Sequence, residues 1–133
     1  MLMVNQDIPF ELIPLREPTF FILLALSKER KHGYAILKDV EALSGGRVVL
    51  STGTLYGALS RLLEQGVIRK SAGDGDDLLH SDLQVNGVDV PKGTRQRKYY
   101  QLTQFGRRVL QAEIQRMQNI LAAASRELGE EIA

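Results

Sequence analysis

The sequence predicts a mainly helical, α+β fold in which a helical domain with a two-stranded ribbon is followed by a long C-terminal helix. Three observations support this prediction. Apolar residues recur at helical spacing in three stretches between residues 18 and 65. Two strand-like stretches, residues 67–70 and 97–102, follow them. Helical periodicity then resumes at Thr103 and continues to the end of the sequence.

The length of 133 residues suits one domain, or one small domain with an appendage. With 44% hydrophobic and 25% charged side chains, the composition matches ordinary globular values. The absence of cysteine excludes disulfides, thiol catalysis and iron–sulfur clusters. The longest apolar run, Phe20 to Leu26, is too short to span a membrane, and no basic region precedes an apolar stretch at the N-terminus. We therefore expect a cytoplasmic location.

Residues 1–17 are expected to form an arm, because Pro9 and Pro14 prevent a continuous helix there. A buried helix should begin near Pro18, since the following residues leave almost no polar face, and run to about residue 30, where Lys31-His32-Gly33 breaks it. The arm would therefore precede a domain that starts at residue 18.

Two shorter helices should follow. The first runs from Tyr34 to about Ser44 and is stopped by two glycines. The second is capped by Ser51 or Thr52 and ends at Gly66. Its apolar positions fall on one stripe, which makes it the most regular of the three: Leu55, Leu59, Leu62 and Leu63. The run at residues 47–49 between the two helices reads as strand-like.

The residues between the two ribbon strands, 71–97, are expected to form an extended loop or wing that closes the domain of residues 18–102. This segment has little core character, and it carries five acidic side chains: Asp74, Asp76, Asp77, Asp82 and Asp89. A phosphate backbone would repel such a stretch.

The C-terminal helix, residues 103–133, carries an apolar seam whose members are separated by 4, 3, 4, 3 and 4 residues: Leu110, Ile114, Met117, Leu121, Ala124 and Leu128. This average of about 3.5 residues is typical of a two-stranded coiled coil. Two partners fit the seam. The helix can pack on its own domain, or it can pair with the same helix of a second copy in a homodimer.

Three short helices followed by a ribbon form the layout of a winged helix-turn-helix, in which the third helix enters the DNA major groove and the ribbon contacts the backbone. Opposite its apolar stripe, the third helix presents small or hydrogen-bonding residues and one cation: Gly53, Thr54, Gly57, Ser60, Arg61 and Glu64. An ordinary solvated face is the alternative. Gly57 favours the groove, because a mid-helix glycine costs about 1 kcal/mol and close approach of DNA is one reason to retain it. A neighbouring segment packed on Gly57 is another.

Net charge is only +1 and by itself predicts no polyanionic partner. The basic residues nevertheless gather in two places that can flank the third helix and neutralise phosphates. One cluster surrounds the first turn: Lys28, Arg30 and Lys31. The other leads into the second ribbon strand: Arg95, Arg97 and Lys98.

Four stretches, in this order, resemble the PadR family of bacterial transcriptional regulators. They are LLAL (23–26), HGYAI (32–36), STGTLYGALSRLLEQGVI (51–68) and RKYYQLTQFGR (97–107), and the resemblance runs from about Leu23 to Leu110. It implies a homodimer of winged-helix domains joined through C-terminal helices, which usually represses transcription until an effector binds. The single terminal helix is similar to the shorter branch of the family. At Thr52 and Gly57 family members often have proline.

The resulting hypothesis is a dimeric, sequence-specific regulator, most simply a repressor, that binds a palindromic double-stranded DNA operator. Base edges are assigned to Thr54 and Arg61, and phosphates mainly to Tyr34, Ser51, Tyr56 and Lys98. The complete expected DNA-binding set is Tyr34, Lys38, Ser51, Thr52, Gly53, Thr54, Tyr56, Gly57, Ser60, Arg61, Arg95, Arg97, Lys98 and Tyr99. The seam on the C-terminal helix is the expected dimer interface.

The alternative function is a winged-helix protein-interaction module that docks a partner protein through its acidic wing. Catalysis is not expected, because His32 and His80 are isolated and no nucleophile motif is present. No metal or cofactor is expected either. An effector, if one exists, is not identified by the sequence, and neither are the operator, the regulated genes, the sign of regulation or the role of the arm.

Overall fold

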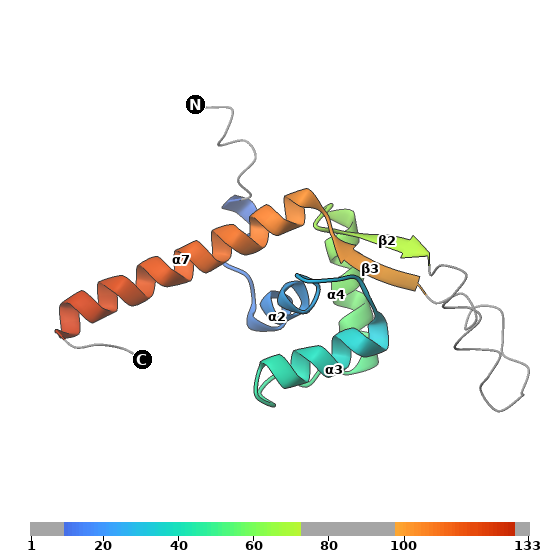
Figure 1. Ribbon diagram of the computed structural model, residues 1–133, viewed down its shortest axis with the longest axis horizontal. Coiled ribbons are helices and arrows are strands. Elements are labelled where there is room, and N and C mark those ends of the chain that lie inside the picture. Colours follow the sequence, from blue (N-terminus) through green and yellow to red (C-terminus); the bar gives the residue numbers. More distant parts are fainter. Residues whose placement is uncertain (1–9, 73–97, 130–133) are drawn as a thin grey trace, which may run out of the picture.

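The computed structural model describes residues 10–72 and 98–129 (Figure 1). The helical domain contains α2 (Glu17–Ala25), α3 (Gly33–Leu43) and α4 (Thr52–Glu64). The strands are β1 (Lys31–His32), β2 (Ile68–Ala72) and β3 (Lys98–Leu102), the terminal helix is α7 (Gln104–Leu128), and a short 3-10 turn, η1 (Phe10–Leu12), precedes α2. The predicted fold class, a winged helix-turn-helix with a long C-terminal helix, is confirmed.

The sheet is antiparallel in the order β1-β3-β2, and Ile68 of β2 lies opposite Leu102 of β3. The short strand β1 is a difference from the sequence prediction, which had a helix break there: Lys31 and His32 pair with Tyr100 and Tyr99. The first helix also ends earlier than predicted, at Ala25, and residues 47–49 form no strand. The predicted wing beyond residue 72 and the first nine residues of the arm lie outside the described residues.

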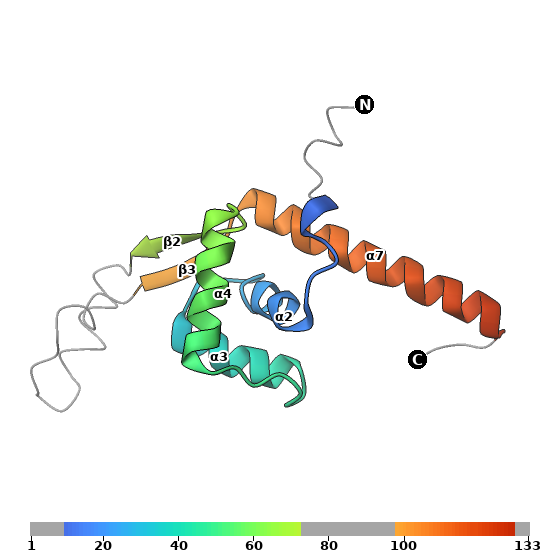
Figure 2. The same ribbon diagram turned by 180° about the vertical axis from the view of Figure 1, so that it is seen from behind.

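The core lies where α2, α3 and α4 meet the inner face of the sheet and the start of α7. Ile22 and Leu23 of α2, Ile36 of α3 and Leu55 of α4 are fully buried there. The sequence predicts that the apolar α2 is buried, and Ile22, Leu23 and Ala25 are buried, while Phe20, Phe21 and Leu24 are partly buried against the same core. Figure 2 shows α2 between α4 and α7.

The helix α7 projects from the domain and is about 37 Å long at 1.5 Å per residue. Its first turns pack on the core, where Val109 and Leu110 are buried. Its second half has no such cover from its own described chain, and Leu121 and Leu128 are 53% and 64% exposed. In the described parts of the chain, no helix is both long and apolar enough to cross a lipid bilayer.

A buried carboxylate fastens the N-terminal segment to α7. Glu113 is only 2% exposed; its Oε2 accepts the Leu15 backbone N–H at 3.0 Å, and its two oxygens accept Nε and Nη2 of Arg116 at 2.7 and 2.8 Å. The hydrogen bonds from Arg116 lower the pKa of Glu113 from its ordinary value; burial opposes this shift, and the Leu15 N–H adds to it.

We expect Glu113→Ala to lower the free energy of unfolding by about 2 kcal/mol at pH 7, because the Leu15 N–H and the Arg116 guanidinium lose their charged acceptor. The folded-state pKa lies below the unfolded value of about 4.3, so the stabilisation is present above that pH and is lost as pH falls through the folded-state pKa. Urea unfolding at a series of pH values checks this. A difference in unfolding free energy between wild type and variant that stays constant down to pH 3 contradicts this prediction.

Candidate nucleic-acid interface

The helix α4 begins with a side-chain cap. The Ser51 Oγ accepts the Thr54 N–H at 3.1 Å and donates to the Thr54 Oγ1 at 3.0 Å. Ser51 rather than Thr52 is therefore the cap, of the two that the sequence allowed. The two hydroxyls are held together at the exposed N-terminal end of α4, where unpaired backbone N–H groups favour an anion.

The outward face of α4 is as small and polar as the sequence predicts. Leu55, Ala58, Leu59 and Leu62 are buried on the inner side. The members of the opposite face are all exposed: Gly53, Thr54, Gly57, Ser60, Arg61 and Glu64. Around Gly57, the nearest atom outside its own helical backbone is the Arg61 Nη1, 4.0 Å from where a Cβ would stand. No other described segment packs on this glycine, so α4 presents a surface that another molecule can approach closely.

Tyr56 lies at the border of this face and is seated on Gly33. A Cβ on Gly33 would lie 2.8 Å from the Tyr56 Cζ and closer still to its hydroxyl oxygen, so any larger residue at position 33 would require the Tyr56 ring to move. The ring is 43% exposed. Burial, and to a lesser extent the electrostatic influence of Tyr56, raises the pKa of the Tyr100 phenol. No sequence pattern indicates the pairing of Gly33 with Tyr56, which are 23 positions apart.

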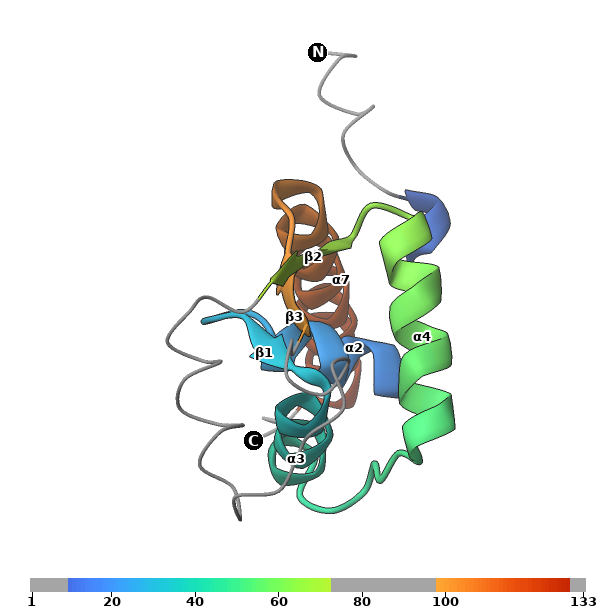
Figure 3. The same ribbon diagram turned by 90° about the vertical axis from the view of Figure 1, so that its right-hand side faces the viewer.

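Tyr34, at the first turn of α3, is 64% exposed. The Lys38 ammonium lies over its ring, 5.6 Å from the centroid. His32 caps the same helix, its Nδ1 accepting the Ala35 N–H at 3.3 Å. The start of α3 lies close to the lower half of α4 (Figure 3), and Gly33, the neighbour of Tyr34, lies against Tyr56.

Tyr99 anchors the ribbon formed by β2 and β3 to the turn that precedes β1. The Arg30 guanidinium lies over the Tyr99 ring, 4.7 Å from its centroid, and its Nη1 donates to the Ser71 Oγ at 3.3 Å. The His32 ring meets Tyr99 edge to face. Arg30, which the sequence placed in a basic cluster, therefore also holds β2 and β3 in position, and half-buried Tyr99 is a supporting residue of the ribbon.

The described cations of the two clusters are not equally available. Lys98 is exposed at the start of β3. Lys31 is paired with Asp39 at 3.3 Å and with Glu29 at 3.7 Å. These two carboxylates weaken the attraction between Lys31 and a polyanion. Arg95 and Arg97, with the acidic wing residues and His80, lie outside the described residues. The structure thus brings the predicted residues of α3, α4 and β3 onto adjoining elements, with β2 following α4 directly.

Among the described residues, no group of three histidine or acidic side chains could hold a metal ion. The arrangement instead offers hydrogen-bond donors, exposed tyrosines and the exposed Lys38 and Lys98 around a helix face of small side chains. That chemistry suits a DNA duplex, in which side chains hold phosphates at the flanks and a helix face reaches the base edges.

Comparison with known proteins gives a consistent result. Residues 22–78 match the Transcriptional regulator PadR-like family. No curated protein matches the chain. Among solved structures, a PadR family transcription regulator from hypervirulent Clostridium difficile R20291 is 26% identical over 85% of this chain and 99% of that chain, with a TM-score of 0.59. A PadR family transcriptional regulator from Eggerthella lenta DSM 2243 is also 26% identical, over 98% of this chain and 99% of that chain, with a TM-score of 0.53.

A third similar structure, Bacillus subtilis PadR in complex with operator DNA, is 21% identical with a TM-score of 0.54. The match covers 74% of this chain but only 47% of the Bacillus protein, so this chain corresponds to about half of that regulator.

Proposed function

We propose, from the premise that residues 22–78 belong to the PadR-like family of transcriptional regulators, that this chain is a sequence-specific DNA-binding repressor. It acts in the cytoplasm as a homodimer on a palindromic operator and is released by an effector. The observation that carries the proposal is the outward face of α4, where exposed Gly57 has no packing partner among the described residues. An operator-bound structure with the same fold, that of the Bacillus protein, supports a DNA partner.

In the proposed complex, the two α4 helices of a dimer enter successive major grooves about 34–36 Å apart. Thr54 and Arg61 reach base edges, while Tyr34, Ser51, Tyr56 and Lys98 hold phosphates. Gly53, Gly57 and Ser60 allow close approach of α4 to the groove, Thr52 lies at its first position, and Lys38 adds charge beside Tyr34. Residues 18–102 form the DNA-binding domain in this scheme.

The terminal helix, with residues 103–133, supplies the proposed dimer contact. Leu110 is already buried in its own chain, so the part of the seam open to a partner starts at Ile114. The exposure of Leu121 and Leu128 supports pairing of two such helices, because apolar side chains at this spacing gain stability by mutual burial.

Fluorescence anisotropy tests the function directly. The full chain is titrated into DNA from its own upstream region and into a scrambled duplex across a salt series. Selective binding, with a salt dependence equivalent to about 6–10 phosphate contacts, supports the proposal. Binding without selectivity that vanishes by about 150 mM salt contradicts it and favours a protein-docking role for the acidic wing.

Two variants should separate readout from positioning. Arg61→Ala is expected to weaken binding to cognate DNA by about 1–3 kcal/mol and to relax the preference for particular bases, because Arg61 is assigned to a base edge.

Lys98→Ala should weaken binding to all DNA sequences alike, because Lys98 is assigned to a phosphate. The salt dependence of binding should then correspond to about one phosphate contact fewer. Anisotropy with cognate and scrambled duplexes measures both. Equal losses on the two duplexes for Arg61→Ala would remove Arg61 from base readout.

A further inference from the structure

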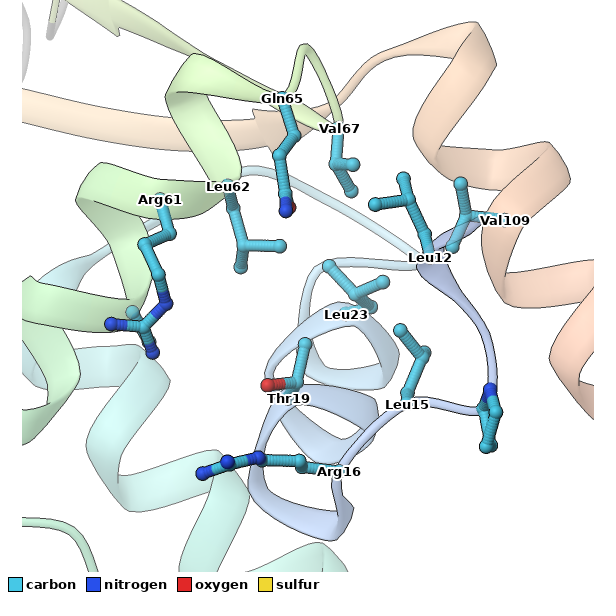
Figure 4. Close-up of a pocket in the computed structure, with 12 residues that line it drawn as sticks. Leu12, Leu15, Arg16, Thr19, Leu23, Arg61, Leu62, Gln65, Val67 and Val109 are labelled. Atoms are coloured by element: carbon cyan, nitrogen blue, oxygen red, sulfur yellow. The ribbon is translucent and has the colours of Figure 1, made fainter. Parts of the chain in front are cut away.

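Two arginines lie together beside α4, at the edge of a cavity of about 390 Å³. The cavity is bounded by the segment that precedes α2, by α2, by the second half of α4 and by α7. Its apolar lining belongs to the hydrophobic core or packs against it: Leu12, Leu15, Leu23, Leu62 and Val109. Figure 4 shows Arg16, Thr19 and Arg61 gathered at the other side. Packing accounts for the leucines but not for the two cations.

Both guanidinium groups are available to an anion. Arg16 and Arg61 are exposed, and neither side chain has a hydrogen bond or an ion pair among the described residues. Arg47, by contrast, is paired with Glu17, and this pair also neutralises the carboxylate next to Arg16 in the sequence. Two like charges at one edge of a cavity repel each other, and an anion bound there relieves the repulsion.

Arg61 lies where this cationic edge meets the outward face of α4. At about 100° per residue, Tyr56 and Arg61 are about 140° apart around the helix, so they bound that face on its two sides. Gly33 of α3 lies against Tyr56, whereas the Arg61 Nη1 is 4.0 Å from where a Cβ on Gly57 would stand. A duplex on this face therefore meets Tyr56 at one border and Arg61, with Arg16 beside it, at the other.

The phosphate contacts proposed above leave the Arg61 border unused. Tyr34 is next to Gly33 in the sequence and so belongs to the Tyr56 side, and Ser51 caps the start of α4. Figure 2 shows the ribbon, which carries Lys98, on the side of α4 away from the segment that precedes α2.

We propose that Arg16 is a further DNA contact, which binds a backbone phosphate across the major groove from the phosphates that Tyr34 and Tyr56 hold. This contact rests on the proposed function. The major groove is about 12 Å wide and is bounded by the phosphates of both strands, so a helix inside it can be held from both sides. A guanidinium forms charge-assisted hydrogen bonds with a phosphate, and the Thr19 hydroxyl supplies another donor beside Arg16.

The backbone that presents Arg16 is held in place by the protein itself. The Leu15 N–H donates to the Glu113 Oε2 of α7 at 3.0 Å, and the carbonyl of Arg16 accepts the Phe20 N–H at 2.9 Å. Binding then orders only the side chain of Arg16, which costs less free energy than ordering a whole segment.

Fluorescence anisotropy of the full chain tests this contact, with a duplex from its own upstream region and a scrambled duplex. Arg16→Gln should weaken binding to both duplexes at least fivefold and reduce the salt dependence by about one phosphate contact per protomer. Arg16→Lys should keep the wild-type salt dependence, because lysine retains the charge. The control, Arg108→Gln, removes an exposed guanidinium of α7 that does not line the cavity, and it should behave as wild type.

Duplexes in which one phosphate at a time is replaced by a neutral methylphosphonate locate the contact. The replacement that weakens wild type but costs Arg16→Gln nothing further identifies the phosphate that Arg16 binds. We expect this phosphate to lie across the major groove from the one identified in the same way with Tyr56→Phe.

Wild-type affinity and salt dependence in Arg16→Gln overturn the contact. A loss confined to the upstream duplex places Arg16 at a base edge, and a loss without a change in salt dependence makes its role structural; each of these results also overturns it. All three leave the proposed function standing. Failure of the wild type to bind any duplex contradicts the proposed function, and the contact falls with it.

Discussion

We expect the Gly106→Ala variant to lose about 3 kcal/mol of unfolding free energy, the effect of overpacking a site that cannot relax. A Cβ at this position in α7 would collide with the carbonyl oxygen of Val67 and stand 2.9 Å from its carbonyl carbon and 3.2 Å from the Leu102 Cδ2. The obstacle is mainly backbone. The same Val67 carbonyl accepts the Thr103 N–H and Oγ1, both at 3.1 Å, so moving it away also breaks the start of α7.

Urea unfolding followed by circular dichroism measures this effect, with Gly57→Ala as the matched control. Both glycines are helical, but a methyl group on Gly57 meets only the Arg61 Nη1 at 4.0 Å. Alanine there should raise the unfolding free energy by about 0.5–1 kcal/mol through helix propensity alone. A Gly106→Ala variant as stable as wild type would mean that α7 can shift away from Val67 without cost.

The contrast between these two glycines indicates what the sequence could predict. The outward position of Gly57 could be predicted because the argument is local: its face of the helix follows from periodicity. Gly106 matched the family pattern, but its structural reason, a helix packed against the backbone of residue 67, is a non-local contact. The cap of α4 was predictable for the same local reason, and Ser51 is that cap, one of the two expected residues.

The candidate site likewise combines local features, which the sequence predicts, with contacts between distant segments, which it does not predict. The exposed face of α4 follows from a 3.6-residue period and could be predicted residue by residue. The seat of Tyr56 on Gly33, the stacking of Arg30 on Tyr99 and the strand β1 all join segments distant in sequence. No single-sequence pattern specifies such pairs. Arg61 illustrates the consequence: its place on the polar face was predicted, but the cavity that it lines beside Arg16 was not.

The largest effect on DNA binding is expected from a change far from the DNA, Leu121→Glu in α7. Leu121 is 53% exposed within its own chain, so the winged-helix domain should still fold. In the proposed dimer, however, two such helices bury this position, and each added carboxylate would be placed in an apolar interface without a partner. Light scattering should therefore change from a mass twice 14.8 kDa to a single chain.

Operator affinity should fall at least a hundredfold in the same variant, because each free domain then reads one half-site and the second contact is no longer intramolecular. The control is Asn119→Glu, which adds the same charge on the opposite, exposed side of α7, where Asn119 accepts a hydrogen bond from Gln115. It should remain dimeric and bind the operator with wild-type affinity. If Leu121→Glu also remained dimeric, the seam would not be the interface. If it became monomeric but bound the operator fully, each domain would act alone, and the proposed dimer would have no role in operator affinity.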